Sequence, residues 1–569
     1  MKGLLVGVLT FAALALAGEA SNHAFVWKWA LALAPVVAVG VLLPRRPEGF
    51  NAAPASVALL FLAAWLAASN AWPGHAYTPA APYHAAFLLG GYLVGRRIHG
   101  PDAAPAIAAA LAFGAAIAGL GLWQLSHGAA RAQALFQTPA TFGAVLNLLA
   151  VPLSAYILLG PARAWSQVAA VALSAGLFAA DSRGAWLALA AGILLVLVLA
   201  RKGGLRPERS AFGRLAVIAV VGWTLSLAVP ALLAWLAAGT PGEAAGHAPS
   251  HSPLSAEAAL SSVGRLGLYD LALRALSSSS LLSGDGYLRF FYLMEASGQG
   301  VATYESTNTT YFVHDDYLQF LLELGAPGAL ALFAVAALPL WCAWRAADRA
   351  DPQNAAIVRR AGLAGALGAM SFQAAIDFPF YVPLCLLLYG TGVGALEVAL
   401  PMRAGPGGGS LRVSLAMKWS RLALLIVVGW LLAAPLAAEL AAAHADRQWR
   451  AARGQSAAYW LAVAQKLQPA DWRYAWYAGQ FWYAQAAAGG NAAAAQRAEK
   501  AFRQACEANP REVRALVGLI RVHRSLRPLL ENAASPAQLL AWTERAVALS
   551  PSDPAALQEH TLVSRALVR

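Results

Sequence analysis

The sequence predicts an all-α polytopic membrane protein with about 12–13 transmembrane helices. Hydrophobic residues make up 59% of its 569 residues and charged residues 12%, whereas a soluble domain carries about 25% charged residues. Apolar runs of roughly the length that crosses a bilayer recur along most of the chain. They lie near residues 4–17, 24–43, 52–69, 81–95, 103–123, 141–160, 165–180, 185–200, 213–238, 326–344, 358–378, 380–400 and 420–440. The first run has the shape of a signal segment, but we interpret it as a retained span because so many others follow it.

The Lys and Arg residues between these runs predict the orientation of the spans. If successive runs cross the membrane in alternation, 19 Lys and Arg residues of the connecting segments fall on one side. The short loops of the other side hold only Lys28, Arg131 and Arg183. Such an excess marks the cytoplasmic side, so the net charge of +13 reflects topology and does not indicate nucleic-acid binding.

Three regions are then expected on the outer side of the membrane. They are the short loop "ADSRGAW" at 180–186, a long loop and the polar segment after the last span. We therefore divide the chain into N-terminal transmembrane helices, a long outer loop, C-terminal transmembrane helices and an outer C-terminal domain. Their expected bounds are 1–238, 239–325, 326–440 and 441–569.

The long loop contains two recognisable stretches after a Gly-, Pro- and Ser-rich start. "VGRLGLYDLALRAL" has the pattern of an amphipathic helix. "SGDGYLRF" at 283–290 is Gly-rich but lacks the Lys-Ser/Thr of a nucleotide-binding P-loop, so we interpret it as a turn. A loop of this length without a full domain core is usually functional.

The C-terminal segment is more polar and carries an internal repeat. Pro469, Pro510 and Pro551 are each 41 residues apart, and each follows a helix-like stretch and precedes another. This arrangement resembles tetratricopeptide repeats, whose usual period is about 34 residues, so inserts are required. We predict a TPR-like helical repeat domain that offers a surface for a protein partner. An irregular helical bundle is the alternative.

Cysteine and histidine spacing favours no metal site and no cofactor. Cys342, Cys385 and Cys506 have no metal-ligand spacing and form no evident disulfide framework. His247 and His251 have the spacing of helix-borne ligands, but Pro249 lies between them. We therefore expect chemistry that uses the protein's own side chains.

Four ionisable residues are expected at the same outer level of the membrane. They are Arg183 in "DSRGAW", Arg265 in "VGRLGLYD", His314 in "VHDDYLQ" and Asp377 in "AAIDFPFYVP". They come from separate parts of the chain, and ionisable groups that converge on one cavity of a membrane protein usually mark a functional site. A shared site would explain why each interrupts an apolar or amphipathic context.

The two arginines have a structural and a functional interpretation. Arg183 either snorkels to lipid headgroups or pairs with Asp181, and Arg265 either lies on a solvated face or anchors the loop helix to headgroups. Alternatively, both guanidinium groups bind a lipid-linked phosphate, which their fixed fork of donors suits. Two arginines together would stabilise the charge of a pyrophosphate leaving group.

His314 is the candidate for proton transfer, since its side chain titrates near neutral pH. A local packing role is the alternative. Asp315 and Asp316 are expected mainly to begin the following helix, where carboxylates accept the free amides of the first turn. Asp316 and Tyr317 are also possible groups for orienting His314 or binding an acceptor, and Asp377 belongs to the same set.

These motifs together resemble one family. "VHDDYLQFLLELGAPGALALF", preceded by the long outer loop and followed by "AIDFPFYVPLCLLLYG", resembles the O-antigen ligase and O-antigen polymerase superfamily. This superfamily also includes bacterial O-oligosaccharyltransferases that glycosylate proteins. "DSRGAWLALAAG" and "FQTPATFGAVLNLLAVPL" are similar to two further segments of it. The resemblance covers roughly residues 100 to 400.

The resemblance implies a C-type glycosyltransferase of the bacterial inner membrane that needs no metal. Its donor is expected to be a glycan linked to undecaprenyl pyrophosphate, bound at the periplasmic face. Arg183 and Arg265 match the family's pyrophosphate-binding arginines, and His314 matches the loop histidine proposed to activate the acceptor hydroxyl. Asp315 stands where relatives often have Asn, which makes the pocket more acidic.

Several functions remain open at this point. Within the family, the acceptor is a lipid A core sugar, another lipid-linked glycan or a protein Ser or Thr. A lipid-glycan flippase belongs to a different class, and it predicts charges along a path through the membrane centre. A membrane scaffold that assembles an envelope complex through its C-terminal repeats is a third class.

Overall fold

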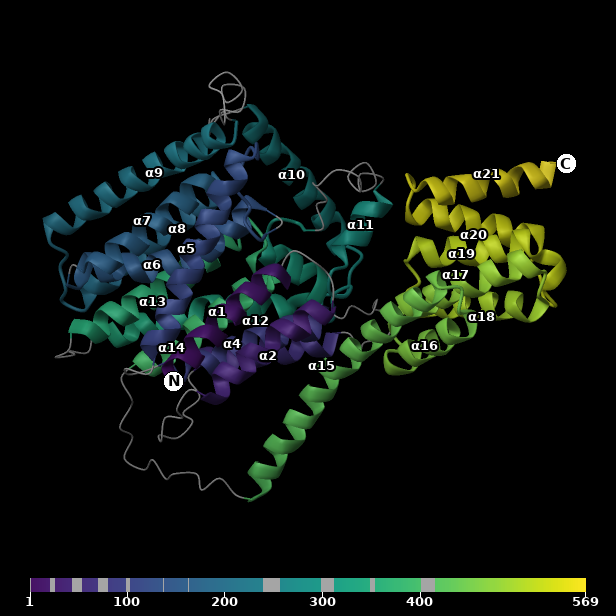
Figure 1. The fold of residues 1–569 in the computed structure, drawn as a ribbon, viewed down its shortest axis with the longest axis horizontal. Helices are drawn as coiled ribbons and strands as arrows, with labels where there is room; N and C mark the ends of the chain where they lie inside the picture. The colour runs from purple at the N-terminus through teal and green to yellow at the C-terminus, as the bar shows by residue number, and fades with distance from the viewer. Residues whose placement is uncertain are drawn as a thin grey trace.

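The computed structural model describes residues 2–20, 26–42, 54–69, 80–98, 103–136, 138–161, 163–238, 256–297, 312–347, 354–400 and 415–568. Within these residues the chain is entirely helical, with no strand. Figure 1 shows two groups of helices: a bundle that contains α1 to α14, and a second group formed by α16 to α21. The all-α prediction is confirmed.

The helices follow the apolar runs closely. Those of the first half are α1 (Lys2–Ala20), α2 (Val26–Leu42), α3 (Pro54–Ala68), α4 (Ala80–Gly95), α5 (Ala104–Ser126), α6 (Pro139–Leu159), α7 (Ala164–Ala180), α8 (Arg183–Lys202) and α9 (Arg209–Ala238). Then come α10 (Ala256–Leu276), α11 (Phe290–Ala296), α12 (Asp316–Ala347), α13 (Asn354–Gln373), the 3-10 helix η5 (Pro379–Tyr381), α14 (Pro383–Ala399) and α15 (Leu415–Arg450). The last are α16 (Gly454–Leu467), α17 (Trp472–Gly489), α18 (Ala492–Ala508), α19 (Val513–Ser525), the 3-10 helix η6 (Arg527–Leu529), α20 (Pro536–Leu549) and α21 (Pro554–Val568).

Six described helices are long and apolar enough to cross a membrane, namely α1, α5, α6, α8, α9 and α12. Four shorter apolar helices, α2, α3, α7 and α14, lie among them. Each of the thirteen predicted runs coincides with a helix or with part of one. The structure thus supports a multi-pass membrane protein, while the count of about 12–13 spans stays a prediction.

Helices α4 and α14 pack with their backbones in direct contact. A Cβ atom on Gly91 would lie 2.1 Å from the carbonyl oxygen of Leu387, and one on Gly394 would lie 2.3 Å from that of Tyr92. The two glycine pairs, in "GYLVG" and "GTGVG", have the small-xxx-small spacing that lets membrane helices approach closely. This contact ties the start and the end of α14 to the same neighbour.

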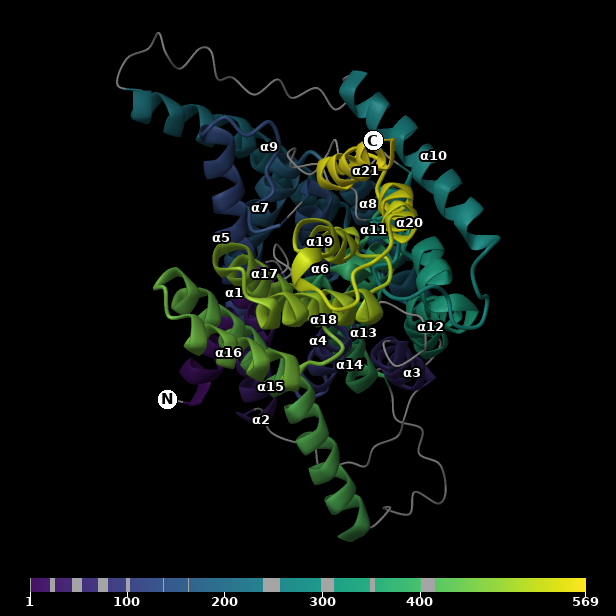
Figure 2. The same cartoon turned by 90° about the vertical axis from the view of Figure 1, so that its right-hand side faces the viewer.

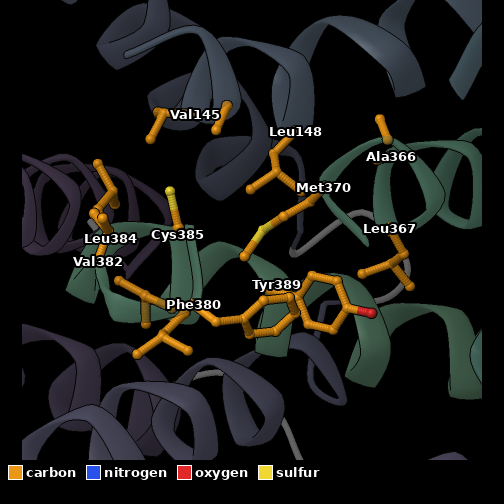
Figure 3. Close-up of a cluster of buried hydrophobic side chains, with 14 of the residues drawn as sticks. Val145, Leu148, Ala366, Leu367, Met370, Phe380, Val382, Leu384, Cys385 and Tyr389 are labelled. Carbon is orange, nitrogen blue, oxygen red and sulfur yellow. The ribbon is translucent and has the colours of Figure 1, made fainter. Parts of the chain in front are cut away.

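The core beneath the candidate site is formed by α6, α13 and α14. Figure 3 shows Val145 and Leu148 on one side of Met370, with Phe380 and Tyr389 on the other. The Phe380 and Tyr389 rings meet edge to face, with centroids 5.0 Å apart. Each of these side chains is buried, so the turn between α13 and α14 rests on a closely packed base.

The predicted turn in "SGDGYLRF" docks on a break in α12. Gly325 has φ 69° and ψ −175°, a conformation that interrupts the helix and favours glycine. The amides of Asp285 and Gly286 donate to the carbonyls of Leu322 and Glu323, at 3.0 and 2.9 Å. The loop therefore satisfies carbonyl groups that the break in α12 leaves without helical partners.

The C-terminal helices repeat one local pattern at the three prolines. Each proline lies two residues after the last residue of a helix and two residues before an acidic residue that caps the next helix. The capping carboxylates belong to Asp471, Glu512 and Asp553, which accept from amides at Arg473, Arg514 and Ala556. The 41-residue spacing thus corresponds to a repeated helix–turn–helix unit, and its assignment as TPR-like stays a prediction. The domain boundary predicted at 441 falls inside α15.

The C-terminal helices also contact the long loop. The side-chain amide of Asn509 donates to the hydroxyl of Tyr292 on α11, at 2.7 Å. A guanidinium nitrogen of Arg511 lies 3.5 Å from the carbonyl oxygen of Asp285. Burial, and after it the nearby positive charge of Arg511, lower the pKa of the Arg289 guanidinium to about 10. Figure 1 shows α11 between the two groups of helices.

Candidate functional site

The structure brings His314 and Asp377 together from segments 63 residues apart. Nδ1 of His314 lies 3.3 Å from Oδ1 of Asp377, and the two side chains are 15% and 3% exposed. His314 directly precedes α12, and Asp377 lies in the turn between α13 and η5. A carboxylate at Nδ1 favours the tautomer that carries its proton there, which leaves Nε2 able to accept one.

The backbone at His314 is strained and held on several sides. Its φ is 63°, a left-handed conformation that is uncommon for any residue except glycine. The hydroxyl of Tyr269 donates to the His314 carbonyl at 3.1 Å, and the amide of Val313 donates to Oε1 of Gln319 at 2.9 Å. Strained residues that surrounding bonds hold in this way are concentrated at functional sites.

Asp315 and Asp316 have different roles, although both were expected to begin α12. Oδ1 of Asp315 accepts from the amide of Leu318 at 3.0 Å, which is the predicted N-cap. Asp316 instead bonds across to the turn that carries Asp377. Its amide donates to the carbonyl of Ala374 at 2.7 Å, and its Oδ2 accepts from the amide of Phe380 at 2.9 Å. The capping prediction is therefore right for Asp315 and wrong for Asp316, because the α13–α14 turn supplies nearer partners.

Arg265 reaches the same turn from α10. Its Nη1 donates to the carbonyl of Ile376, the residue before Asp377, at 2.9 Å. The guanidinium has further N–H groups beyond this one, so it is able to hold the turn and bind an anion as well. Figure 2 shows α10 running along the outside of the bundle.

Arg183 is exposed in the first turn of α8, and it lies next to the turn that carries Asp377. A Cβ atom on Gly184 would lie 3.2 Å from Cδ1 of Ile376, so the start of α8 packs against the residue before Asp377. The hydroxyl of Ser182 caps α8 by accepting from the amide of Ala185. The positive end of the helix dipole therefore lies beside the turn that carries Asp377.

Arg131 is a residue that sequence reasoning did not single out as a candidate. Its Nη2 donates to the carbonyl of Asp181, which has a left-handed φ of 44° between α7 and α8. It thereby holds the turn that presents Arg183. A sequence signal existed, because Arg131 is one of three cations assigned to the short outer loops.

Tyr317 points away from the His314–Asp377 pair. Its hydroxyl donates to the carbonyl of Ser371 on α13, at 2.9 Å. Phe378 instead lies against the histidine ring, edge to face with centroids 5.0 Å apart, and stacks on Phe312 at 4.1 Å. Aromatic rings therefore flank His314 on the side of the α13–α14 turn.

Two carboxylate oxygens at the site lack a hydrogen-bond donor from the described part of the chain. Oδ1 of Asp316 and Oδ2 of Asp377 are buried without a hydrogen-bond partner among the described residues. Such orphaned acceptors are costly unless another donor reaches them. A sugar or protein hydroxyl bound near His314 would supply such donors.

Burial changes the acid–base behaviour of the groups around His314. It raises the pKa of the Tyr269 hydroxyl, and the nearby Asp315 carboxylate raises it further. Burial likewise raises the pKa of Asp315. Tyr269 thus stays a donor to the His314 carbonyl throughout the neutral range.

Within the described ranges, no group of three or more His, Cys, Asp or Glu side chains could hold a metal ion. The pair His247 and His251 lies outside the described residues. The residues able to bind a phosphate-containing ligand are Arg183 at the start of α8 and Arg265 in the middle of α10.

The fold and the site define a multi-pass membrane protein with a His–Asp pair and two arginines at one end of its helices. Residues 168–333 match the family model described as O-antigen ligase. Arg183, Arg265 and His314 lie within the matched segment, whereas Asp377 lies beyond it. The match confirms the resemblance that the sequence motifs carried.

A comparison with curated proteins finds no match to this chain. The family match and the apolar helices together indicate a membrane glycosyltransferase of the O-antigen ligase type.

Proposed function

We propose that this protein transfers a preassembled glycan from a polyprenyl-pyrophosphate donor to an acceptor hydroxyl at the periplasmic face of the bacterial inner membrane. The observation that carries the proposal is the His314–Asp377 hydrogen bond at 3.3 Å, in a turn that Arg265 also holds. This arrangement places a proton acceptor beside groups suited to a pyrophosphate. The family match over residues 168–333 supports the same reaction class.

In this reaction the acceptor oxygen attacks the anomeric carbon of the glycan. The bond from that carbon to the pyrophosphate oxygen breaks, and the electron pair leaves with the polyprenyl pyrophosphate. Nε2 of His314 takes the proton of the attacking hydroxyl, and the Asp377 carboxylate stabilises the imidazolium that results. Direct attack of this kind inverts the configuration at the anomeric carbon.

The pyrophosphate leaving group needs compensation for its negative charge. Arg183 and Arg265 supply permanent cations, and guanidinium groups match phosphate oxygens with paired donors. The start of α8 adds the positive end of its helix dipole. We assign the pyrophosphate to the region between the start of α8 and Arg265 in the middle of α10.

We assign the acceptor to the side of the site where Asp316 and Asp377 lie, because each of these carboxylates has one oxygen without a hydrogen-bond donor among the described residues. Oδ1 of Asp316 and Oδ2 of Asp377 are the acceptors that hydroxyl groups of a sugar or of a Ser or Thr would satisfy. The C-terminal helices contact the long loop at Tyr292, and they offer a surface for a protein acceptor or an assembly partner. A lipid A core sugar, another lipid-linked glycan and a protein Ser or Thr are therefore all candidate acceptors within one mechanism.

Reconstitution tests the proposal. The purified protein is placed in vesicles with an undecaprenyl-pyrophosphate-linked oligosaccharide and, in turn, a lipid A core, a second lipid-linked glycan and an unfolded Ser/Thr-rich protein. We expect transfer to one acceptor class, release of undecaprenyl pyrophosphate in equal amount, and the same rate in the presence of EDTA. Transport of the donor across the bilayer without any transfer would support a flippase and contradict the proposal.

A further inference from the structure

Glu323 is a fully buried carboxylate on α12 that the mechanism does not use directly. It accepts four hydrogen bonds, from the amides of Leu288 and Phe290, the side-chain amide of Gln319 and the hydroxyl of Tyr381. Their lengths run from 2.7 to 3.1 Å. A buried carboxylate is costly unless donors satisfy it, and these four do so. Glu323 thereby fastens the long loop, α12 and the η5 turn to one another.

One of these bonds leads to His314. Gln319 donates from Nε2 to Oε1 of Glu323 at 3.0 Å and accepts with its own Oε1 from the amide of Val313. Glu323 therefore orients the Gln319 amide, which in turn holds the backbone directly before His314. This hold matters because His314 has the strained φ of 63°.

Another bond leads to Asp377. Tyr381 ends the η5 helix, four residues after Asp377, and its hydroxyl donates to Oε2 of Glu323 at 2.7 Å. Asp316 supports the same segment through the amide of Phe380. Both members of the His314–Asp377 pair thus rest on segments that are bonded to Glu323.

We propose that Glu323 is a positioning residue for glycan transfer, whose carboxylate sets the relation of His314 to Asp377 through Gln319 and Tyr381. The inference rests on the proposed function. The inference extends the proposed function to Glu323. This carboxylate lies more than two helical turns from His314 along α12 and acts without contacting the substrate. Small displacements of a catalytic group lower the turnover rate more than they lower substrate binding.

The test compares Glu323→Gln and Gln319→Leu with Glu397→Gln as the matched control. Glu397 is also a buried carboxylate of the bundle, and it accepts from the hydroxyl of Tyr92 at 2.7 Å, far from His314. All variants are purified as full chains and assayed in the same vesicles. We expect Glu323→Gln and Gln319→Leu each to lower kcat about tenfold, with the donor KM within about twofold. Glu397→Gln should transfer at the unaltered rate.

The double variant separates positioning from a general loss of stability. If Gln319 acts through Glu323, the combined change lowers kcat about as much as either change alone, so the effects are not additive. Multiplied effects, or an unchanged kcat in both single variants, would overturn the inference. If Glu323→Gln fails to insert, Gln319→Leu retains three of the four bonds and carries the same expectation. Absence of transfer by the unaltered protein would overturn the proposed function and this inference with it.

Discussion

The two ends of the helix bundle differ in how their charged side chains are paired. At the end of α4 and α14, Glu397 accepts from Tyr92 at 2.7 Å and lies 3.8 Å from Arg96. Arg359 donates there to the carbonyl of Ile98 at 2.6 Å. Each of these charges therefore has a protein partner, as a purely structural cluster requires.

At the opposite end of the bundle, buried carboxylate oxygens lack hydrogen-bond donors from the described part of the chain. Asp316 and Asp377 each hold one carboxylate oxygen with no partner among the described residues, and His314 is strained beside them. Chains that are otherwise consistent break such rules mainly at functional sites. The comparison therefore separates an end where the Glu397 carboxylate is paired within the protein from an end where the Asp316 and Asp377 carboxylates each have one oxygen without a donor among the described residues.

The largest expected effect comes from removing the proton acceptor. His314→Ala should lower the rate of glycan transfer about a thousandfold, because general base catalysis contributes about that much. Transfer is measured in vesicles with the donor and the acceptor that the unaltered protein uses. His127→Ala, at the end of α5 near the same side, is the control and should retain normal transfer. Equal rates for both variants would show that His314 is not the proton acceptor.

Substitution of the two arginines should weaken binding of the glycan donor. Arg183→Ala and Arg265→Ala should each raise the donor KM or lower kcat/KM about 10- to 100-fold, since a charged hydrogen bond contributes about 1.5–3 kcal/mol. Lys at either position should restore activity only in part, because it lacks the paired donors of Arg. Arg274→Ala is the matched control, as this exposed residue of α10 pairs with Asp270 at 2.7 Å. A loss as large in this control would indicate a general effect of surface charge.

The smallest effect is expected at the N-cap of α12. Asp315→Ala should lower the free energy of unfolding by about 1 kcal/mol, because the Leu318 amide loses its acceptor. Asp315→Asn should keep most of that stability, since its side-chain oxygen still caps the helix. Denaturant unfolding in detergent, followed by tryptophan fluorescence, measures both. A stability loss in the Asn variant equal to that in the Ala variant would show that the cap is not the cause.

The sequence predicted the elements better than the connections between them. Apolar length and composition placed α1 to α9 and α12 to α14, the amphipathic pattern indicated α10, and "SGDGYLRF" was correctly interpreted as a turn, whereas α11 was not predicted. These features are local, so periodicity and turn chemistry were enough to find them. The carboxylate of Asp315 was likewise identified as a cap from its position before an apolar run.

The connections depend on contacts between distant segments and were partly missed. The partner of Asp316 is the amide of Phe380, 64 residues away, and nothing near Asp316 indicates it. Glu323 carried a signal, because it is an acid inside the apolar stretch "FLLELG" with Gln319 one helical turn before it. Its four donors come from three segments, however, and their meeting is a property of the fold.

In the proposed function, the end of the bundle with His314 performs the chemistry and the end with Glu397 does not. The same change, acid to amide, is therefore made at both ends: Asp377→Asn and Glu397→Gln, in one vesicle preparation with one donor and acceptor. We expect Asp377→Asn to lower kcat roughly 10- to 100-fold, because His314 loses the carboxylate that stabilises its protonated form, while Glu397→Gln stays within about twofold. Equal kcat values for the two variants, with both correctly inserted, would contradict this expectation.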